Sequence, residues 1–462
     1  MRAAGTAADA MRAGFDQLRI ELKIPPTFPG AVVAAASAAA DRAPGAGHVD
    51  RTDLPFVTLD PAASTDLDQA FTIERSGDDL LLRYAIADVG WFVEANGPID
   101  AEAWQRGTTM YFPDGRTGLY PPVLSEHAAS LLPDGPRPAV VFAVRLSADG
   151  VPTLDGAERA VIRSRAKLAY DSVRPEELPP ELDEFARRMA HGDEIRGASR
   201  VEPPEQEIEP DGAGSYRISF RPRLATEDAN ASMSLATNMA VGSALLRAGT
   251  GLFRVMPAPD ERAISRLRHT AHAMGLNWPK HTELQMFEHT LDPDRARDAA
   301  FMMAIRRAGG GARYVPFDAG VVPWHAAMAA TYSHATAPLR RLADRYVVAA
   351  ALAVANGHAV DEAVQAAFPL LPEVMERADA IGSKIERGAI DLAEAVVLQG
   401  SEGTEYTAVV TDQDERGARI QLREVAVVAR VKVAGVGLGD EIRVRLVEAD
   451  PLRRLIRFDV VA

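Results

Sequence analysis

The chain of 462 residues has no cysteine, fewer basic than acidic residues and no long apolar run. Without cysteine, disulfide bonds, thiolate zinc sites and cysteine nucleophiles are excluded. The composition also fits the reducing cytoplasm, where we expect the protein to work. No apolar run reaches about 18 residues, so no membrane-spanning segment is expected. Asp9 and Arg12 interrupt the N-terminal segment too early for a secretory signal.

Negative charge exceeds positive charge along the chain. The 51 Lys and Arg residues are outnumbered by 65 Asp and Glu, which gives a formal net charge of −14. Such a charge is unfavourable for a general nucleic-acid binder. Net charge describes the whole surface, however, so a local basic channel remains compatible with it.

Two short helices are predicted before the main body of the chain. Residues 6–23 carry apolar side chains at helical spacing, with Thr6 as the expected N-cap, and residues 31–40 form a second apolar, alanine-rich stretch. The glycines and polar residues between 45 and 53 predict a linker. About fifty residues are too few for a substantial core of their own. We therefore expect these helices to dock on the main domain, with a small helix-turn-helix remnant as the alternative.

Clustered strands followed by clustered helices predict an α+β fold. Short runs rich in β-branched and aromatic residues alternate with turns from 55 to 170, whereas 176–211 predicts a helix and then an exposed loop. A long helix is predicted from about 225 to 248, and Gly249 stands where a C-cap glycine is expected. Five short strands in 403–462 indicate a small OB-type barrel, with a generic small β-domain as the alternative.

Three carboxylates lie within nine residues at the end of an apolar strand, at Asp60, Asp66 and Asp68. Like charges this close raise one another's pKa unless a cation compensates them. Oxygen ligands without histidine or cysteine favour Mg²⁺ or Mn²⁺, and a pair of such ions is a common device for phosphoryl transfer. Without further context, a solvated acidic turn is the alternative.

Four segments, in this order, supply the context: DPAASTDLDQAFTIE, YAIADVGWFV, IDAEAWQRGTTMYFP and YSHATAPLRRLAD. Together they resemble the RNB catalytic domain of ribonuclease II-type exoribonucleases, and the resemblance runs from about 55 to 395. The C-terminal barrel occupies the place of this family's OB-fold RNA-binding domain. The resemblance implies three parts: a short helical segment over 1–50, an RNB catalytic domain with a mixed sheet surrounded by helices over 51–399, and an OB-fold domain over 400–462.

The family typically carries two cold-shock OB domains before its catalytic domain. The helical spacing and alanine content of residues 1–50 do not suit a five-stranded barrel. We therefore expect no cold-shock domain in this segment, and a more open entrance for RNA.

The resemblance implies a metal site at Asp60, Asp66 and Asp68, with Asp68 as the indispensable catalytic carboxylate. The fourth family aspartate is Gln69 here. Glutamine keeps a carbonyl oxygen as a ligand but removes one negative charge. One of two metal ions is then expected to bind more weakly or with help from a substrate phosphate, so the number of ions stays open.

Arg340 matches the family's catalytic arginine, which implies that it holds the scissile phosphate and stabilises charge in the transition state. Pro338 is expected to be the first residue of a helix whose free N–H groups also favour a phosphate. Ala337 replaces a family serine that would have capped this helix. His334 also matches the family pattern as a substrate-binding residue, with a hydrogen-bonded structural histidine as the alternative.

Two tyrosines match family positions that contact RNA: Tyr111, which corresponds to a base-stacking residue, and Tyr170, which corresponds to a residue lining the catalytic cavity. For both, a core aromatic is the alternative. Arg163, Arg165 and Lys167 alternate along a predicted strand, so they should share one face and form a basic stripe along the RNA path, unless that face is simply solvated.

The predicted barrel contains only two aromatic residues, Tyr406 and Phe458. OB folds that bind single strands usually stack bases on aromatic side chains. RNA binding by this barrel is therefore expected to depend more on basic groups. These are Arg443, Arg445, Arg453, Arg454 and Arg457.

These observations predict a Mg²⁺-dependent (or Mn²⁺-dependent) hydrolytic exoribonuclease. By resemblance, it would degrade single-stranded RNA without sequence preference from the 3′ end and release 5′-nucleoside monophosphates. The resemblance does not indicate how far it acts on adjacent duplex. No membrane and no obligate protein partner is expected. The alternative is an RNA-binding protein that keeps the fold without cleavage. Gln69 favours that alternative, as do Ala231 and Ser232, which stand where many family members carry a glutamate.

Overall fold

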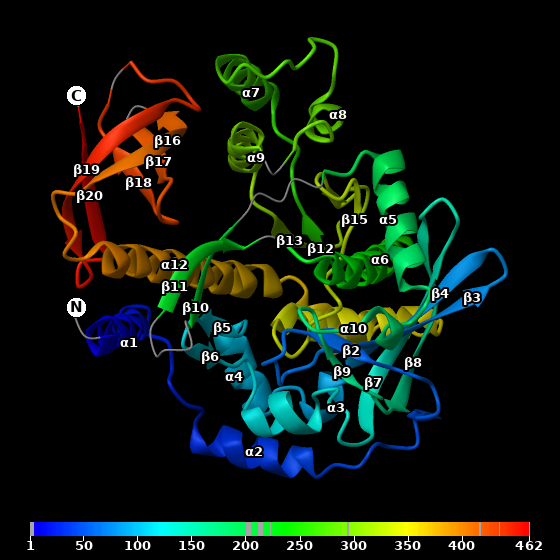
Figure 1. The fold of residues 1–462 in the computed structure, drawn as a ribbon. Coiled ribbons are helices and arrows are strands. Elements are labelled where there is room, and N and C mark those ends of the chain that lie inside the picture. Colours follow the sequence, from blue (N-terminus) through cyan, green and yellow to red (C-terminus); the bar gives the residue numbers. More distant parts are fainter. Residues whose placement is uncertain are drawn as a thin grey trace.

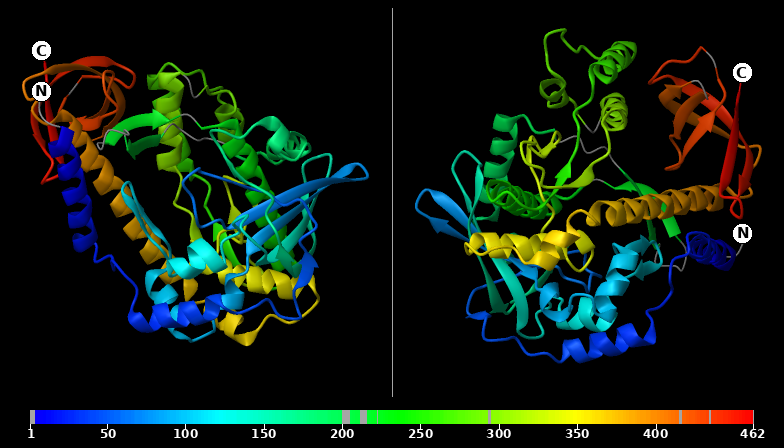
Figure 2. Two further views of the ribbon diagram at one scale, coloured as in Figure 1. Left: turned by 60° about the horizontal axis from the view of Figure 1, so that its bottom comes forward. Right: turned by 180° about the vertical axis from the view of Figure 1, so that it is seen from behind.

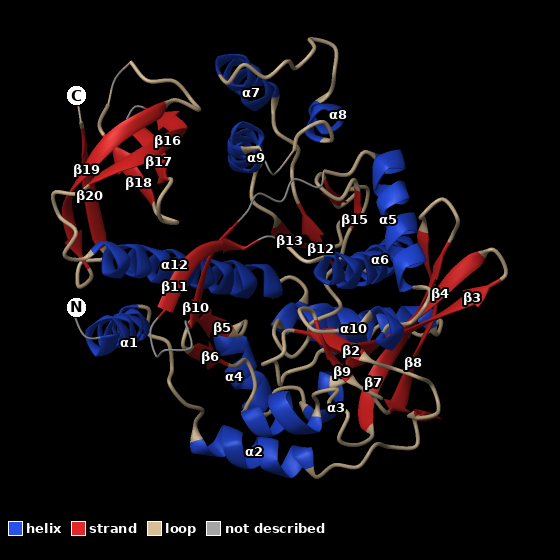
Figure 3. Cartoon of the chain, viewed as in Figure 1, coloured by secondary structure: helices blue, strands red, loops and turns tan. Residues whose placement is uncertain are grey.

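A computed structural model describes residues 4–199, 205–210, 216–221, 223–292, 295–414, 417–433 and 435–461. The chain forms a large body of mixed helices and strands. From this body the long helix α12 (Leu371–Leu398) leads to a β-barrel at the C-terminal end (Figure 1, Figure 3). This is the α+β architecture that the sequence predicts.

Both N-terminal helices dock on the rest of the chain, as expected. α1 (Ala4–Glu21) lies along α12, where its Phe15 shares an apolar cluster with Leu392 (Figure 1). α2 (Gly30–Ala40) contributes to the core of the main body. Thr6 lies inside α1 rather than before it, so the predicted N-cap is wrong.

The predicted linker is also wrong, because it contains a strand of the main sheet. β1 (Val49–Arg51) pairs in parallel with β8 (Pro152–Ile162). The segment around residue 50 is therefore held by backbone hydrogen bonds and does not separate two independent units.

The main sheet has the order β1-β8-β7-β4-β3, and all neighbours except β1 and β8 are antiparallel. Its remaining strands are β7 (Arg137–Leu146), β4 (Asp79–Ala87) and β3 (Gln69–Ser76). The apolar run through the middle of β7 is buried, as a strand needs when the sheet is covered by other elements. Helices α6 (Ala225–Arg247) and α10 (Leu342–Ala355) pack against this sheet.

Short elements connect the sheet to the helices around it. The helical ones are α3 (Val89–Phe92), α4 (Pro98–Arg106), a π-helical turn (Leu124–Ala128), a 3₁₀ turn (Pro175–Glu177), α5 (Leu182–Arg196) and α11 (Glu362–Ala367). The strands form a parallel pair, β2 (Thr58–Asp60) with β9 (Lys167–Ala169), and a hairpin, β5 (Met110–Phe112) with β6 (Gly115–Thr117).

The region predicted as a helix and an exposed loop contains the helix α5 but also a strand. β10 (Glu205–Pro210) pairs with β11 (Tyr216–Arg221), and this hairpin packs against α12. The loop prediction is therefore wrong for 205–210, whereas 200–204 lies outside the described residues.

The predicted long helix is confirmed as α6. Gly249 follows it with a φ of +68°, a left-handed conformation that favours glycine. Three helices beyond it share their own apolar cluster: α7 (Glu261–Ala273), α8 (Leu284–Glu288) and α9 (Ala296–Ala308). Two small hairpins flank them, β12 (Leu252–Val255) with β13 (Arg313–Pro316), and β14 (Trp324–His325) with β15 (Ala330–Thr331).

The C-terminal strands form a nearly closed antiparallel barrel with the order β18-β17-β16-β19-β20 (Figure 2). They are β16 (Glu405–Asp414), β17 (Gly417–Leu422), β18 (Val428–Val431), β19 (Glu441–Asp450) and β20 (Leu455–Val460). The barrel has its own apolar core, which confirms the five-stranded prediction. Within the described part of the chain, no helix is both long and apolar enough to cross a bilayer.

Candidate active site

The three predicted carboxylates are brought together by two strands and the loop between them. Asp60 ends β2, whose parallel pairing with β9 sets Asp60 beside Ala169 and Tyr170. Asp66 and Asp68 lie in the loop before β3. Ser130 holds this loop in place, because its buried hydroxyl accepts the N–H of Leu67 (2.8 Å) and donates to the carbonyl of Thr65 (2.7 Å).

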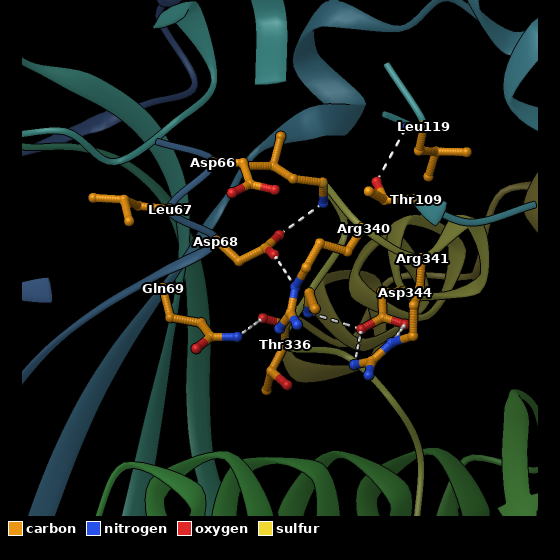
Figure 4. A network of polar contacts seen from close by, with 12 residues as sticks. Asp66, Leu67, Asp68, Gln69, Thr109, Leu119, Thr336, Arg340, Arg341 and Asp344 are labelled. Atoms are coloured by element: carbon orange, nitrogen blue, oxygen red, sulfur yellow. Dashed lines mark hydrogen bonds and ion pairs between the residues drawn. The ribbon is translucent and has the colours of Figure 1, made fainter. Parts of the chain in front are cut away.

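Asp68 is bound to Arg340 across a sequence separation of 272 residues (Figure 4). Its Oδ2 accepts Nε of Arg340 at 2.9 Å, and its Oδ1 accepts the backbone N–H of Leu339 at 2.7 Å. The Asp68 side chain is 3% exposed, whereas that of Arg340 is 42% exposed. The arginine therefore uses one edge to hold the acid and keeps its outer nitrogens accessible.

The turn that carries Arg340 differs from the prediction. α10 begins at Leu342, so Pro338 lies in a turn before the helix and is not its first residue. The amides expected to face a phosphate are already occupied, since Leu339 N donates to Asp68 and Ala337 N donates to Asp344 Oδ2 at 2.8 Å. A carboxylate from the first turn of α10 thus fixes the turn before the helix, although the helix itself has no side-chain cap.

A second carboxylate–arginine pair stiffens this turn. Arg341 makes a two-pronged contact with the fully buried Asp344, with Nε to Oδ1 at 2.9 Å and Nη2 to Oδ2 at 2.7 Å. The carbonyl of Arg340 accepts the N–H of Thr109 at 2.9 Å. Arg340 therefore projects from a backbone held on both sides.

The side chain of Gln69 is held away from the carboxylates (Figure 4). Its Nε2 donates to the carbonyl of Thr336, and its Oε1 accepts the hydroxyl of Tyr84 at 3.2 Å. The Tyr84 hydroxyl also lies 2.8 Å from Ser234 Oγ on α6. The prediction of Gln69 as a metal ligand is not supported, because its amide links the turn that carries Arg340 to the sheet and to α6.

Uncompensated negative charge remains at the acidic loop. Burial, and then repulsion from Asp68, raise the pKa of Asp60 to about 7. Burial raises the pKa of Asp68 to about 6, although Arg340 and the Leu339 N–H pull in the other direction. These directions agree with the sequence argument that close carboxylates raise one another's pKa unless a cation compensates them.

The donor set fits a hard cation at Asp60 and Asp66. Among described residues, the Asp60 side chain has no hydrogen bond or ion pair, and only Oδ1 of Asp66 is bound to a partner, Arg116. Asp68 is committed to Arg340, and no three His, Asp or Glu side chains of the described residues are arranged to hold one ion together. The raised pKa of Asp60 shows that its negative charge is electrostatically unfavourable in the folded chain, and a bound cation would offset this cost.

A cavity of about 940 Å³ brings the predicted residues together. Its lining includes Asp60, Asp66, Arg340 and both predicted tyrosines. The Tyr111 side chain is 49% exposed, and the Tyr170 hydroxyl accepts Nδ2 of Asn230 at 2.7 Å. The core alternative is therefore wrong for Tyr111, and Tyr170 lies at the cavity as expected.

The predicted basic stripe does not form. β8 ends at Ile162, so Arg163 and Arg165 lie in the following loop and only Lys167 belongs to β9. Arg165 Nη2 is bound to the carbonyls of Thr52 and Asp53, and the Lys167 ammonium donates to Ala62 O at 2.8 Å. The alternation along the sequence failed because the chain leaves the sheet between β8 and β9.

His334 fits the structural alternative. Its Nδ1 lies 2.7 Å from the Tyr314 hydroxyl, and its ring packs edge-on against those of Tyr314 and Tyr332. Burial, followed by nearby arginines, keeps the pKa of His334 well below its usual value, so the ring is neutral. It is not among the described residues that line the cavity.

Sequence reasoning missed Arg116, which lines the same cavity. Arg116 pairs with Asp66 through Nη1, and its Nη2 contacts Thr65 Oγ1 at 2.7 Å and Glu126 Oε1 at 3.0 Å. The hairpin β5–β6 carries it, and the register sets Arg116 directly opposite Tyr111.

Comparison with known proteins explains this constellation. The family model of the RNB domain matches residues 48–355, which is more than half of the chain. The chain belongs to the RNB-domain family of RNase II-type exoribonucleases. The RNase II-type exonuclease C-terminal S1 domain matches residues 404–461, where the barrel lies.

Relatives of this RNB protein include ribonucleases R from two bacteria. It is 26% identical to that of Aquifex aeolicus over 95% of this chain and 69% of that protein. It is 30% identical to that of Escherichia coli over 65% of this chain, which amounts to 39% of that protein. The alignments thus cover 69% and 39% of these two enzymes.

Solved structures share the RNB fold over nearly the whole chain. The apo form of Mycoplasma genitalium RNase R has a TM-score of 0.86 at 19% identity, covering 98% of this chain and 78% of that one. That enzyme is also known in complex with ribose-methylated single-stranded RNA and with double-stranded RNA. Yeast Ssd1, described as a pseudonuclease, matches with a TM-score of 0.67 at 16% identity, over 87% of this chain and 53% of that one. The fold alone therefore does not separate nucleases from pseudonucleases.

The basic groups expected on the S1 barrel of the RNB protein are paired with glutamates. Arg443 and Arg445 both contact Glu405, and Arg453 and Arg457 both contact Glu448. Arg454 contacts Glu21 of α1. These arginines are thus partly neutralised on the surface.

Proposed function

We propose that this chain is a divalent-metal-dependent hydrolytic exoribonuclease, with Mg²⁺ as its ion. It shortens single-stranded RNA from the 3′ end and releases 5′-nucleoside monophosphates without sequence preference. The observation that carries the proposal is the cavity in which Asp60, Asp66 and Arg340 lie together with Tyr111 and Tyr170. An acidic loop, an accessible arginine and aromatic faces are what cleavage of a stacked, flexible RNA end requires.

Each of these residues has a separate task. The accessible edge of Arg340 would bind the scissile phosphate and stabilise its charge in the transition state, which an arginine fork suits better than a lysine. Asp68 would hold Arg340 in place through Nε and orient the attacking water. Tyr111 would stack on a base near the 3′ end, and stacking is indifferent to base identity.

The metal belongs at the acidic loop. Asp60 and the second oxygen of Asp66 would hold Mg²⁺, because carboxylate oxygens are its preferred protein ligands and the Asp60 side chain has no partner among the residues that the structure describes. When bound, the ion would supply Lewis-acid polarisation of the phosphate and activation of water. Mn²⁺ has the same ligand preference and would also fit.

The alternative, an RNA-binding protein that keeps the fold without cleavage, has less support. Binding alone does not require three buried or half-buried acids beside an arginine, since acids repel phosphate. The Asp68–Arg340 pair also costs desolvation that only a use for both groups would justify.

A 5′-labelled single-stranded oligonucleotide tests the proposal. With Mg²⁺ we expect a ladder that shortens from the 3′ end and released 5′-monophosphates in mass spectrometry, and no shortening in EDTA. Asp68→Asn, purified in the same way, controls for contaminating nucleases. Binding without shortening would refute the proposal and support the alternative.

A further inference from the structure

The Arg116 side chain contacts the acidic loop at Thr65 and Asp66. It reaches Asp66 from the β5–β6 hairpin, and its own side chain is 23% exposed against 9% for Asp66. The same guanidinium contacts Thr65 Oγ1 and Glu126 Oε1, so three groups fix its position. The guanidinium of Arg116 is therefore a positive charge held at a fixed position inside the site.

The charges of the site leave room for one divalent ion. Four carboxylates face three basic groups, which leaves one excess negative charge. The carboxylates are those of Asp60, Asp66, Asp68 and Glu126, and the basic groups are those of Arg116, Arg340 and Lys167. One Mg²⁺ and one scissile phosphate would bring the site to neutrality, whereas a second Mg²⁺ would leave two positive charges uncompensated.

The side chains available as metal ligands also indicate a single metal ion. Gln69 is turned to Thr336 and Tyr84, so its Oε1 already accepts a hydrogen bond and is a poorer ligand for a second ion. Asp68 is bound by Arg340, and Asp66 is shared with Arg116. Of the three aspartates, only Asp60 is free of a described partner.

We infer that Arg116 takes the place of a second metal ion, so that this site binds a single divalent cation. The inference rests on the proposed function, whose metal it counts. Arg116 is in this sense a positioning residue, because it neutralises Asp66 permanently and holds it for the one ion that Asp60 also binds.

Counting bound Mn²⁺ on the full-length protein tests the inference without measuring hydrolysis. In equilibrium dialysis with free Mn²⁺ read by electron paramagnetic resonance, the wild type should saturate at one ion per chain. Arg116→Gln frees Asp66 and removes one positive charge, so it should gain a second, weaker site. Arg116→Lys keeps the charge and should remain at one.

Controls separate charge from folding. Arg19 pairs with Asp114 on the same hairpin and is 21% exposed, close to the 23% of Arg116. Arg19→Gln should therefore remain at one ion. Circular dichroism of each variant checks the fold, and if Arg116→Gln does not fold, a second ion on the wild type or on Arg116→Lys still overturns the inference.

The outcomes distinguish the inference from the proposed function. Two ions on the wild type, or an unchanged count in folded Arg116→Gln, would overturn the inference and leave a metal-dependent nuclease standing. No specific Mn²⁺ on the wild type would overturn both. One ion on the wild type, followed by no hydrolysis of RNA, would overturn only the proposed function.

Discussion

Removing the Asp60 carboxylate should stabilise the metal-free protein while it destroys the site. Asp60 is partly buried, lacks a hydrogen-bonding partner among the described residues, and is repelled by Asp68. Its pKa therefore rises from 3.8 to about 7 in the folded chain. Asparagine has nearly the same shape without the charge, so Asp60→Asn removes that electrostatic cost.

The size of the gain follows from the shift in pKa. A folded-state pKa above the unfolded value means that stability is fully present at low pH and is lost as the pH rises to about 7. At 1.36 kcal/mol per pKa unit, the cost removed by Asp60→Asn is about 4 kcal/mol at pH 8 and about 2 kcal/mol at pH 5.5.

Thermal unfolding in EDTA measures this difference. The entropy of unfolding is about 2 cal/mol/K per residue, so the gain at pH 8 should raise Tm by up to about 4 °C for a chain of this length. The gain should fall to about half at pH 5.5. With Mg²⁺ the wild type is stabilised by its bound ion, so the advantage of the variant should shrink or reverse.

A matched control uses an acid outside the site. Asp149 lies at an exposed turn, and Asp149→Asn should leave Tm unchanged at both pH values. If Asp60→Asn lowered Tm in EDTA at pH 8, or if its gain were equal at the two pH values, the argument that Asp60 carries uncompensated charge would be refuted.

Three further substitutions test the catalytic roles. Asp68→Asn should leave RNA affinity in filter binding intact or increased, but reduce kcat more than tenfold, which is about 1.4 kcal/mol of barrier; a smaller loss would contradict its assignment. Arg340→Lys should reduce kcat on the order of a hundredfold, because a point charge cannot hold both Asp68 and a phosphate; a rise in KM alone would make Arg340 a binding residue. Tyr111→Ala should lengthen the final undegraded oligomer on a sequencing gel, because it removes about 1–3 kcal/mol of stacking; an unchanged end product would exclude stacking.

Local patterns predicted the parts of the fold that depend on local physics. The long helix α6, which Gly249 follows, and the five strands of the barrel are predicted by periodicity and turn residues, and both are confirmed. The Asp60–Asp68 segment was identifiable because its three carboxylates lie close in sequence. By contrast, the strand β10 was missed because its acidic and proline-rich composition is typical of loops, whereas its pairing with β11 and contact with α12 are tertiary.

Predictions that failed at the site depended on partners far away in the sequence. The turn at Pro338 has the composition of a helix start, but Asp68, 271 residues away from Leu339, takes the amide of that turn. Gln69 looks like a weakened ligand until Thr336 and Tyr84 occupy its amide. In each case a group that was expected to bind substrate or metal is instead hydrogen-bonded to a residue far away in the sequence.

Arg116 is different, because a local signal for it existed. The Pro-Asp-Gly sequence at 113–115 is typical of a tight turn, and a two-residue turn sets Tyr111 opposite Arg116 in an antiparallel pair. Residues directly opposite each other in such a pair project from the same face. Once Tyr111 was assigned to the cavity, the hairpin register required Arg116 to be there too. The position of Arg116 in the site could therefore have been predicted from the register of this one hairpin, without knowing which residues from other parts of the sequence lie nearby.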